Sequence, residues 1–266
     1  MKVKESAFLK EAIRFIGYGS QFGWHERNAG NLSLLLIEDE LNLVRDDFSF
    51  ENEWIKLSIP VLELANEFVF TTVSGSYFID IHNDSENKFC ICQISEDGTA
   101  YRIVWGVEKP TSELCGHLMS LESLKKRNGG RAIYHCHPSN VVALSYIIPQ
   151  TDKDISNALW ESETECAFVF PKGIGVVGFC VPGSIELAKL TSAKINDYDA
   201  VLWSCHGVFA TGDSIATAFG LVHAIEKAAE IRMKILSTGK EIFCAITKEQ
   251  QRMCAETYGF KLNEFK

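Results

Sequence analysis

Two histidines separated by one residue are the strongest chemical signal in this sequence of 266 residues. His135 and His137 lie in the run 132–137, which is apolar enough to predict a strand. Because side chains alternate along a strand, both imidazoles would project to one side and could bind one metal ion. Pro138 would end the strand and leave the pair at its tip. A pair of ordinary polar histidines fits the same spacing, because histidine is also a common polar residue.

A third histidine and a glutamate extend this pattern. His206 ends the apolar run 200–206, and three imidazoles with an open fourth position are typical of catalytic zinc. Glu113 is a candidate acid–base group at the start of a predicted helix, although a carboxylate there also stabilises a helix N-terminus. His117 lies one helical turn further on, so Glu113 and His117 form an alternative metal pair. The residues alone do not rank His117 against His206.

Two polar segments could bind a phosphate group. Residues 27–33 (RNAGNLS) and 72–76 (TVSGS) combine glycine with serine and asparagine. Glycine allows the backbone to approach an anion closely, and the polar side chains donate hydrogen bonds without adding charge. Such segments are equally typical of plain turns.

The composition limits the classes of function and of fold. With 26 Lys and Arg against 35 Asp and Glu, the net charge is −9, which argues against a nucleic-acid or anionic-membrane surface. A phosphorylated ligand would therefore need backbone amides, neutral donors or a metal. Nine cysteines without a CxxC pair predict reduced thiols in the cytoplasm. We expect one domain over residues 1–266, because no repeat or proline-rich linker divides the chain.

The elements that must position these residues can be predicted from local patterns. We expect an acidic surface loop at 38–53, and turns at 74–76 and 97–98. Leu9, Ile13 and Ile16 share one face of an amphipathic helix predicted at 6–16. Start and stop residues predict two more helices, from Thr111 to about Arg127 with an end at 128–130, and at 214–237 before Gly239. Strands are predicted at 67–73, 89–94, 101–105, 132–137, 166–170, 175–180 and 200–206. Helices interleaved with short strands predict an α/β fold with a sheet covered by helices.

Several longer strings resemble the rhamnulose-1-phosphate aldolases of the class II aldolase and sugar-phosphate epimerase superfamily. They occur in that family's order and nearly at its spacing, from about residue 5 to the end of the chain. The strings are GWHERNAGNL at 23–32, PTSEL at 110–114, HCH at 135–137, LWESETEC at 159–166 and HGVF at 206–209. The first and fourth are the narrowest and favour the rhamnulose branch over its fuculose and ribulose relatives.

The resemblance implies a fold and a reaction. The fold would be a three-layer αβα sandwich with a central, largely antiparallel sheet, in a homotetramer whose active sites lie between subunits. The reaction would be reversible retro-aldol cleavage of L-rhamnulose 1-phosphate into dihydroxyacetone phosphate and L-lactaldehyde. A metal ion would stabilise the enediolate as a Lewis acid, and no lysine in the sequence is marked as a Schiff-base nucleophile.

The resemblance also implies the role of individual residues. His135, His137 and His206 would bind one zinc ion per subunit, and Glu113 would be the acid–base group at the dihydroxyacetone phosphate carbon. Glu165 would reach the site from a neighbouring subunit. The phosphate and its adjoining atoms would be bound by Asn28, Asn31, Thr72, Ser74, Gly75, Thr111 and Ser112.

The chain departs from the family pattern near the phosphate site. His25 stands where the pattern has Asp, Ala29 where it has Gly, and Ser76 where it has Lys. Glu161, Glu163 and Glu165 would share one face if their segment were extended, so the choice of Glu165 rests on the resemblance.

Three alternative functions remain open at this level. A fuculose-1-phosphate aldolase or a sugar-phosphate 4-epimerase would use the same scaffold. A metal-free interaction module on this fold would need neither the histidines nor Glu113. A purely structural zinc site would predict unfolding on chelation.

Overall fold

A mixed α/β fold is seen in the computed structural model, which describes residues 1–83, 85–106, 109–127 and 129–265. Within these residues the strands form one nine-stranded sheet in the order β2-β5-β4-β3-β1-β6-β9-β8-β7. The strands are β1 Asn31–Leu35, β2 Ile55–Lys56, β3 Phe68–Thr72, β4 Phe89–Ile94, β5 Ala100–Trp105, β6 Ala132–Cys136, β7 Gly175–Val177, β8 Ala200–Trp203 and β9 Gly207–Gly212. Strands β7 and β8 pair in parallel, and the other neighbours in this order pair antiparallel.

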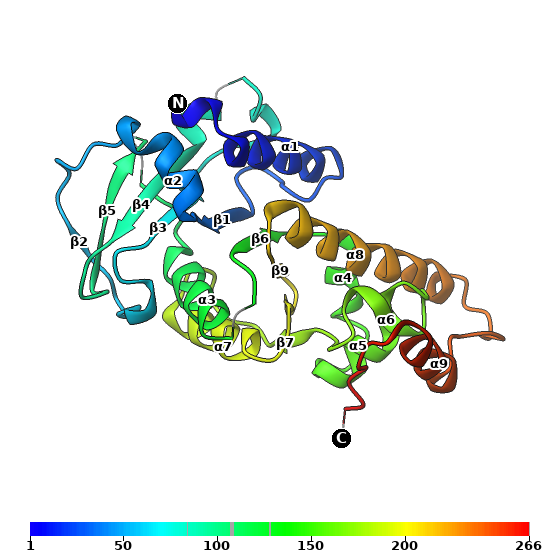
Figure 1. The fold of residues 1–266 in the computed structure, drawn as a ribbon. Helices are drawn as coiled ribbons and strands as arrows, with labels where there is room; N and C mark the ends of the chain where they lie inside the picture. The colour runs from blue at the N-terminus through cyan, green and yellow to red at the C-terminus, as the bar shows by residue number, and fades with distance from the viewer. Residues whose placement is uncertain (84, 107–108, 128, 266) are drawn as a thin grey trace.

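Helices lie on both sides of this sheet (Figure 1). The α-helices are α1 Ala7–Gln21, α2 Glu38–Val44, α3 Leu114–Lys126, α4 Ser139–Leu144, α5 Asp152–Trp160, α6 Cys166–Val169, α7 Ile185–Ile195, α8 Ile215–Ser237 and α9 Lys248–Tyr258. Short 3-10 helices are η1 Val3–Glu5, η2 Arg45–Asp47, η3 Leu62–Leu64, η4 Phe78–Asp80 and η5 Ser85–Lys88. No helix within the described ranges has both the length and the apolar character that crossing a bilayer requires.

The two faces of the sheet bury two separate apolar clusters. On β6, Tyr134 and Cys136 belong to the cluster that also contains residues of α1 and α8. Ile133, on the opposite face of the same strand, belongs to the cluster under α3 and α7. This division follows from the two-residue repeat of a strand, because alternate side chains of β6 must be buried against different helices.

The alternation on β6 decides where its first histidine lies. His135 shares the face of Ile133, so its imidazole lies on the α3 and α7 side of the sheet. In the antiparallel register of β1 and β6, Asn31 lies opposite His135. Strand β9 pairs with the other edge of β6. A tight turn joins β8 to β9, and His206 lies in that turn. The register thereby places residues 31, 135 and 206 at the same end of three neighbouring elements.

Most predicted elements are confirmed, with altered ends. The predicted helix at 6–16 is α1, which begins after its cap Ser6, and the helix at 214–237 is α8 with Ser214 as its cap. Helix α3 begins one residue after Glu113, and Asn128 in its predicted end signal lies outside the described residues. The predicted strands at 67–73, 89–94, 101–105, 132–137, 175–180 and 200–206 correspond to β3, β4, β5, β6, β7 and β8.

Two predicted elements are wrong. The expected loop at 38–53 contains α2 and η2, because Leu41 and Val44 are buried on one face while Glu40 pairs with Arg131 at 2.8 Å. The expected strand at 166–170 is instead α6, which packs against α8 and α9. A short apolar run cannot be told from a buried helical turn by periodicity alone, so the packing decides. Strands β1, β2 and β9 and helices α4, α5, α7 and α9 were not predicted.

Candidate active site

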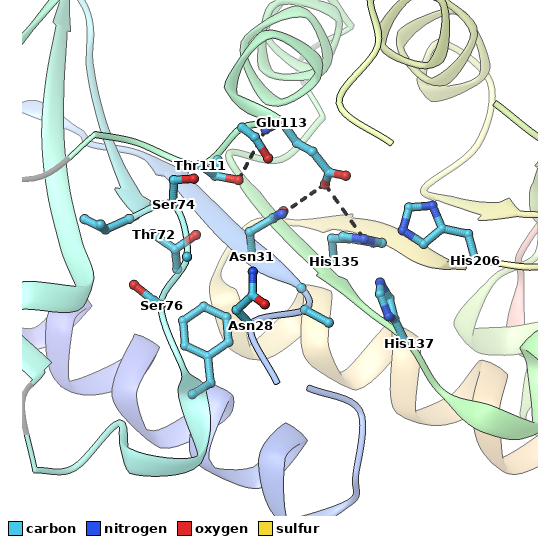
Figure 2. A pocket seen from close by; sticks show the side chains of 16 residues that line it. Asn28, Asn31, Thr72, Ser74, Ser76, Thr111, Glu113, His135, His137 and His206 are labelled. Carbon is cyan, nitrogen blue, oxygen red and sulfur yellow. Dashed lines mark hydrogen bonds and ion pairs between the residues drawn. The ribbon is translucent and has the colours of Figure 1, made fainter. Parts of the chain in front are cut away.

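Three histidines converge at one end of the sheet: His135 on β6, His137 just after the end of that strand, and His206 in the β8–β9 turn. One ligand nitrogen of each of His135, His137 and His206 lies within 4.8 Å of the others. Their ring centroids are separated by 5.1 Å (His135 to His137), 5.2 Å (His135 to His206) and 4.9 Å (His137 to His206). Figure 2 shows the three rings facing one another beside Glu113. In the described part of the chain, this is the group of side chains whose geometry suits a metal ion.

Hydrogen bonds at the far side of two rings determine which nitrogen is available. His135 Nδ1 lies 3.0 Å from the carbonyl oxygen of Val208, and His137 Nδ1 lies 2.6 Å from Oε1 of Glu26. Because both partners can only accept, each Nδ1 carries a proton, and in the neutral ring each Nε2 presents a lone pair. His137 Nε2 is buried and finds no hydrogen-bond partner among the described residues. An orphaned nitrogen lone pair beside two further imidazoles fits a divalent metal such as zinc.

Burial and neighbouring charges keep two of these histidines, His135 and His206, neutral. Burial, followed by repulsion from His137 and His206, holds the pKa of His135 well below its usual range. Burial and then His137 lower the pKa of His206 to about 4. Neutral imidazole is the form that ligates metals, so the site is prepared for a cation at neutral pH.

Glu113 lies at the edge of the histidine cluster. Its Oε2 accepts a hydrogen bond from Asn31 Nδ2 at 2.9 Å and lies 3.8 Å from His135 Nε2. The side chain is only 10% exposed, because the N-terminal end of α3 packs over the sheet. Burial raises the pKa of this carboxyl group, while the hydrogen bond from Asn31 works in the opposite direction. A carboxyl group with a raised pKa beside a possible metal site is suited to carrying a proton near neutral pH.

A pocket of about 160 Å³ joins the histidines to the two polar segments. Eleven of the twelve site residues predicted from the sequence line it, and Figure 2 draws the labelled members around one hollow. They are Asn28, Asn31, Thr72, Ser74, Gly75, Thr111, Ser112, Glu113, His135, His137 and His206. None of its described lining residues is a lysine or an arginine. An anion in this pocket would therefore meet neutral donors, as the charge of −9 leads one to expect.

Two backbone features shape the polar end of the pocket. Thr111 N donates to Thr72 O at 2.8 Å, and Ser74 N donates to Lys109 O at 2.9 Å. Residues 72–74 and 109–111 are therefore joined edge to edge. Gly75 has a φ of +81°, and a Cβ built there would meet open space. Glycine is therefore required at position 75 by its backbone conformation, which exposes the turn toward the pocket.

The sequence patterns did not reveal the role of His25. This buried side chain holds the segment 28–31 by a hydrogen bond to its backbone. Its Nδ1 donates to Ala29 O at 3.1 Å, and its Nε2 lies 2.6 Å from Oη of Tyr134. Burial lowers the pKa of His25 to about 4, so the ring is neutral. Oη of Tyr134 also donates to the carbonyl oxygen of Phe15 at 3.1 Å, so Nε2 of His25 and this carbonyl share the one phenolic proton. The contact connects strand β6 to this loop. Glu26 was also overlooked, and the string GWHE at 23–26, which holds both residues, was the available signal.

The remaining predicted residues lie elsewhere. Glu165 is exposed at the N-terminal end of α6 and does not line this pocket. Glu161, Glu163 and Glu165 span the end of α5 and the start of α6, so they do not share a strand face. His117 is buried and its Nδ1 donates to Ser33 Oγ at 2.8 Å, outside the histidine cluster. The alternative Glu113 and His117 metal pair is therefore not formed.

Comparison with known proteins identifies the family. The model of the class II aldolase and adducin N-terminal domain matches residues 18–233. This chain belongs to that family. It is 40% identical to the rhamnulose-1-phosphate aldolase of Yersinia pestis over 242 residues, which cover 89% of this chain and 88% of that protein. The rhamnulose-1-phosphate aldolase of Mannheimia succiniciproducens is 38% identical over the same length, covering 89% of each.

Solved structures of two sugar-phosphate aldolases share the fold of this chain. A sugar-phosphate aldolase from Thermotoga maritima superposes with a TM-score of 0.77 at 31% identity, covering 88% of this chain and 97% of that one. An L-fuculose 1-phosphate aldolase superposes with a TM-score of 0.64 at 21% identity, covering 96% of this chain and 98% of the other. The second likeness shows that the two chains share a fold. The α/β fold and the family resemblance read from the sequence are thereby confirmed.

Proposed function

We propose that this protein cleaves L-rhamnulose 1-phosphate reversibly into dihydroxyacetone phosphate and L-lactaldehyde. The observation that carries the proposal is one pocket in which Glu113 Oε2 lies 3.8 Å from His135 Nε2, beside a cluster of three imidazoles. The relatives named as rhamnulose-1-phosphate aldolases match almost the whole chain, and this supports the substrate.

A zinc ion bound by His135, His137 and His206 is part of the proposal. When bound, it would supply a Lewis acid for the negative charge that cleavage leaves on a substrate oxygen. The donor set fits because Nδ1 protons of His135 and His137 are already donated to Val208 and Glu26. Three neutral ligands leave the full charge of the cation available to an anionic substrate.

Glu113 is proposed to hold and move the proton at the dihydroxyacetone phosphate carbon. Its burial favours the protonated form, and the Asn31 amide holds Oε2 in a fixed direction. In cleavage this carboxyl group would protonate the carbon from which the aldehyde leaves, and in synthesis its carboxylate would remove that proton.

The phosphate group is proposed to lie at the opposite end of the pocket. The donors there are the side-chain amides and hydroxyls of the lining residues, beside the open turn at Gly75. They belong to Asn28, Asn31, Thr72, Ser74, Thr111 and Ser112. Neutral donors and backbone amides bind an anion without the desolvation that a buried lysine would require.

A second carboxylate is needed for the hydroxyl whose carbon becomes the aldehyde. We propose Glu165 of a neighbouring subunit for this role, in a homotetramer with its sites between subunits. The exposure of Glu165, away from the pocket of its own chain, supports this assignment. We further propose one domain over residues 1–266, arranged as three layers around the largely antiparallel sheet, that acts in the cytoplasm.

The decisive experiment measures dihydroxyacetone phosphate released from L-rhamnulose 1-phosphate, with and without a chelator. We expect turnover that a chelator abolishes and added Zn²⁺ restores, while circular dichroism reports a folded chain throughout. Equal turnover of L-fuculose 1-phosphate, or epimerisation without cleavage, would assign a different reaction to the same site. Unfolding on chelation would indicate structural zinc, and the absence of bound metal would indicate an interaction module.

A further inference from the structure

A short helix joins the segments that carry two of the three histidines. Helix α4 begins two residues after His137 and packs against α8 (Figure 1). Its far end leads into Ser145, which contacts the β8–β9 turn one residue before His206. His137 lies beyond the last residue of β6 and His206 lies between two strands, so neither belongs to a paired strand. The positions of these two rings therefore depend on contacts outside the strand pairing.

Glu226 of α8 holds the start of α4. The first amides of a helix find no acceptor within the helix, and Pro138 at the cap position of α4 makes no side-chain hydrogen bond. Glu226 Oε1 accepts from Asn140 N at 3.0 Å and from Asn140 Nδ2 at 2.8 Å, and its Oε2 accepts from Val141 N at 2.9 Å. A serine or aspartate at the cap position would satisfy one of these amides locally, but it would not tie the segment to α8. The buried carboxyl group thus fixes the path of the chain after His137 from a helix far away in the sequence.

Ser145 holds the turn before His206 at the other end of α4. Its buried Oγ accepts from Cys205 N at 3.0 Å and donates to Val142 O at 2.6 Å. Cys205 has a φ of +62°, in the left-handed region that a residue with a side chain rarely adopts. Such a conformation persists only where neighbouring groups hold it. The Ser145 hydroxyl is a group of this kind, and it acts on the residue that precedes His206.

We propose that Glu226 and Ser145 are positioning residues for the zinc site, and that α4 sets the separation between His137 and His206. This inference rests on the proposed function, because it concerns the metal ion of that site. Neither residue is among the described residues that form the histidine cluster or line the pocket. The centroids of the two rings lie 4.9 Å apart, and a shift of either segment would change that separation. Loss of either contact should therefore weaken Zn²⁺ binding, although all three ligands remain.

Glu226→Gln tests the start of α4. Glutamine keeps the size of the side chain and one acceptor oxygen, so one of the two backbone amides loses its acceptor. A hydrogen bond made only in the metal-binding arrangement changes affinity about fivefold, so the dissociation constant for Zn²⁺ should rise by about that factor. Competition with a chromophoric chelator measures it at a temperature where circular dichroism shows a folded chain. Glu230→Gln is the matched control, because Glu230 lies one turn further along α8 and pairs with Lys227 and Lys234 of the same helix.

Ser145→Ala tests the other end of α4 by removing one oxygen atom. Cys205 N then loses its acceptor, so the turn can leave its left-handed conformation and shift His206. We expect the dissociation constant for Zn²⁺ to rise about fivefold here as well. Ser156→Ala is the matched control: Ser156 is buried in α5 and its Oγ accepts from Ile174 N at 2.9 Å, so a bond of the same kind is lost outside the histidine cluster. This control should lower Tm by a similar amount and leave the affinity for Zn²⁺ unchanged.

The outcomes separate this inference from the function on which it rests. A group that only stabilises the fold would lower Tm alone, so affinities equal to those of the controls would overturn the inference. Equal loss of affinity in Ser156→Ala would overturn it too. Each variant decides for its own residue, and Ser145→Ala with its control decides the inference where Glu226→Gln does not fold. The proposed function stands in these cases if the unmodified protein binds Zn²⁺ and releases dihydroxyacetone phosphate. An unmodified protein that binds no Zn²⁺ would overturn the zinc site of the proposed function, and the role of both residues with it.

Discussion

His137 donates its Nδ1 proton to Oε1 of Glu26 across 2.6 Å, between a residue that follows β6 and one in the loop after α1. The bond orients Nε2 of His137 toward the other two imidazoles. A carboxylate on the far nitrogen of a metal-binding histidine also raises the basicity of the ring. Glu26 is therefore a positioning residue for the proposed zinc site.

Removal of Glu26 should weaken metal binding. We expect Glu26→Ala to raise the dissociation constant for Zn²⁺ about 10- to 100-fold, and Glu26→Gln to have a smaller effect because its amide oxygen still accepts the bond. Competition with a chromophoric chelator measures both constants without an activity assay. Glu53→Gln, which removes an exposed carboxylate elsewhere, is the control. Equal affinities of Glu26→Ala and the control would contradict the role.

Glu113 should be required for turnover and not for metal binding. Glu113→Gln keeps the size of the side chain and an oxygen that can accept from Asn31, but it cannot transfer a proton. We expect kcat to fall by about two to four orders of magnitude, with nearly one zinc ion per chain still bound. Steady-state kinetics and elemental analysis of the same preparation provide the two values. Unchanged turnover would remove Glu113 from the mechanism.

The contact between His25 and Tyr134 should affect the phosphate end of the pocket. Tyr134→Phe removes the hydroxyl that lies 2.6 Å from His25 Nε2 and also donates to Phe15 O, so the His25 ring and the Ala29 loop are less firmly held. A neutral hydrogen bond contributes about 1 kcal/mol, so the inhibition constant of inorganic phosphate should rise about fivefold. Affinity for Zn²⁺ should stay the same. Tyr101→Phe in β5 is the control, and a loss of zinc affinity without a change in phosphate binding would refute this coupling.

Stability of the metal-free chain should fall with pH below neutrality. Burial lowers the pKa of His25 to about 4 and that of His117 to about 3, against 6.5 in an unfolded chain. Between these values the unfolded state binds more protons, so the free energy of unfolding decreases as pH falls from 6.5 toward 4. Each histidine should account for about 2 kcal/mol of loss at pH 5.

Urea unfolding at pH 7.0 and 5.0 measures this loss. His117→Asn should show a smaller difference between the two pH values than the unmodified chain, even where its stability at pH 7.0 is lower. An identical pH difference in both chains would show that His117 is not buried in its neutral form.

Local sequence patterns were sufficient to predict those features that depend only on residues close together in the chain. An amphipathic pattern located α1, start and stop residues located α3 and α8, and alternation along the predicted strand 132–137 indicated that His135 and His137 could serve one metal ion. The family resemblance selected eleven residues that share one pocket, although they are spread from Asn28 to His206.

Contacts between distant segments decided the rest. The acidic stretch after residue 37 folds into α2 because Leu41 and Val44 pack into the apolar cluster and Glu40 pairs with Arg131. These partners lie far away in the sequence, so the stretch alone does not indicate them. The pairing of β6 with β9 brings His206 to the metal-suited cluster, whereas Ser33 on β1 binds His117 elsewhere. Strand register and helix packing arise from long-range burial, so the partners of each imidazole could be known only from the tertiary structure.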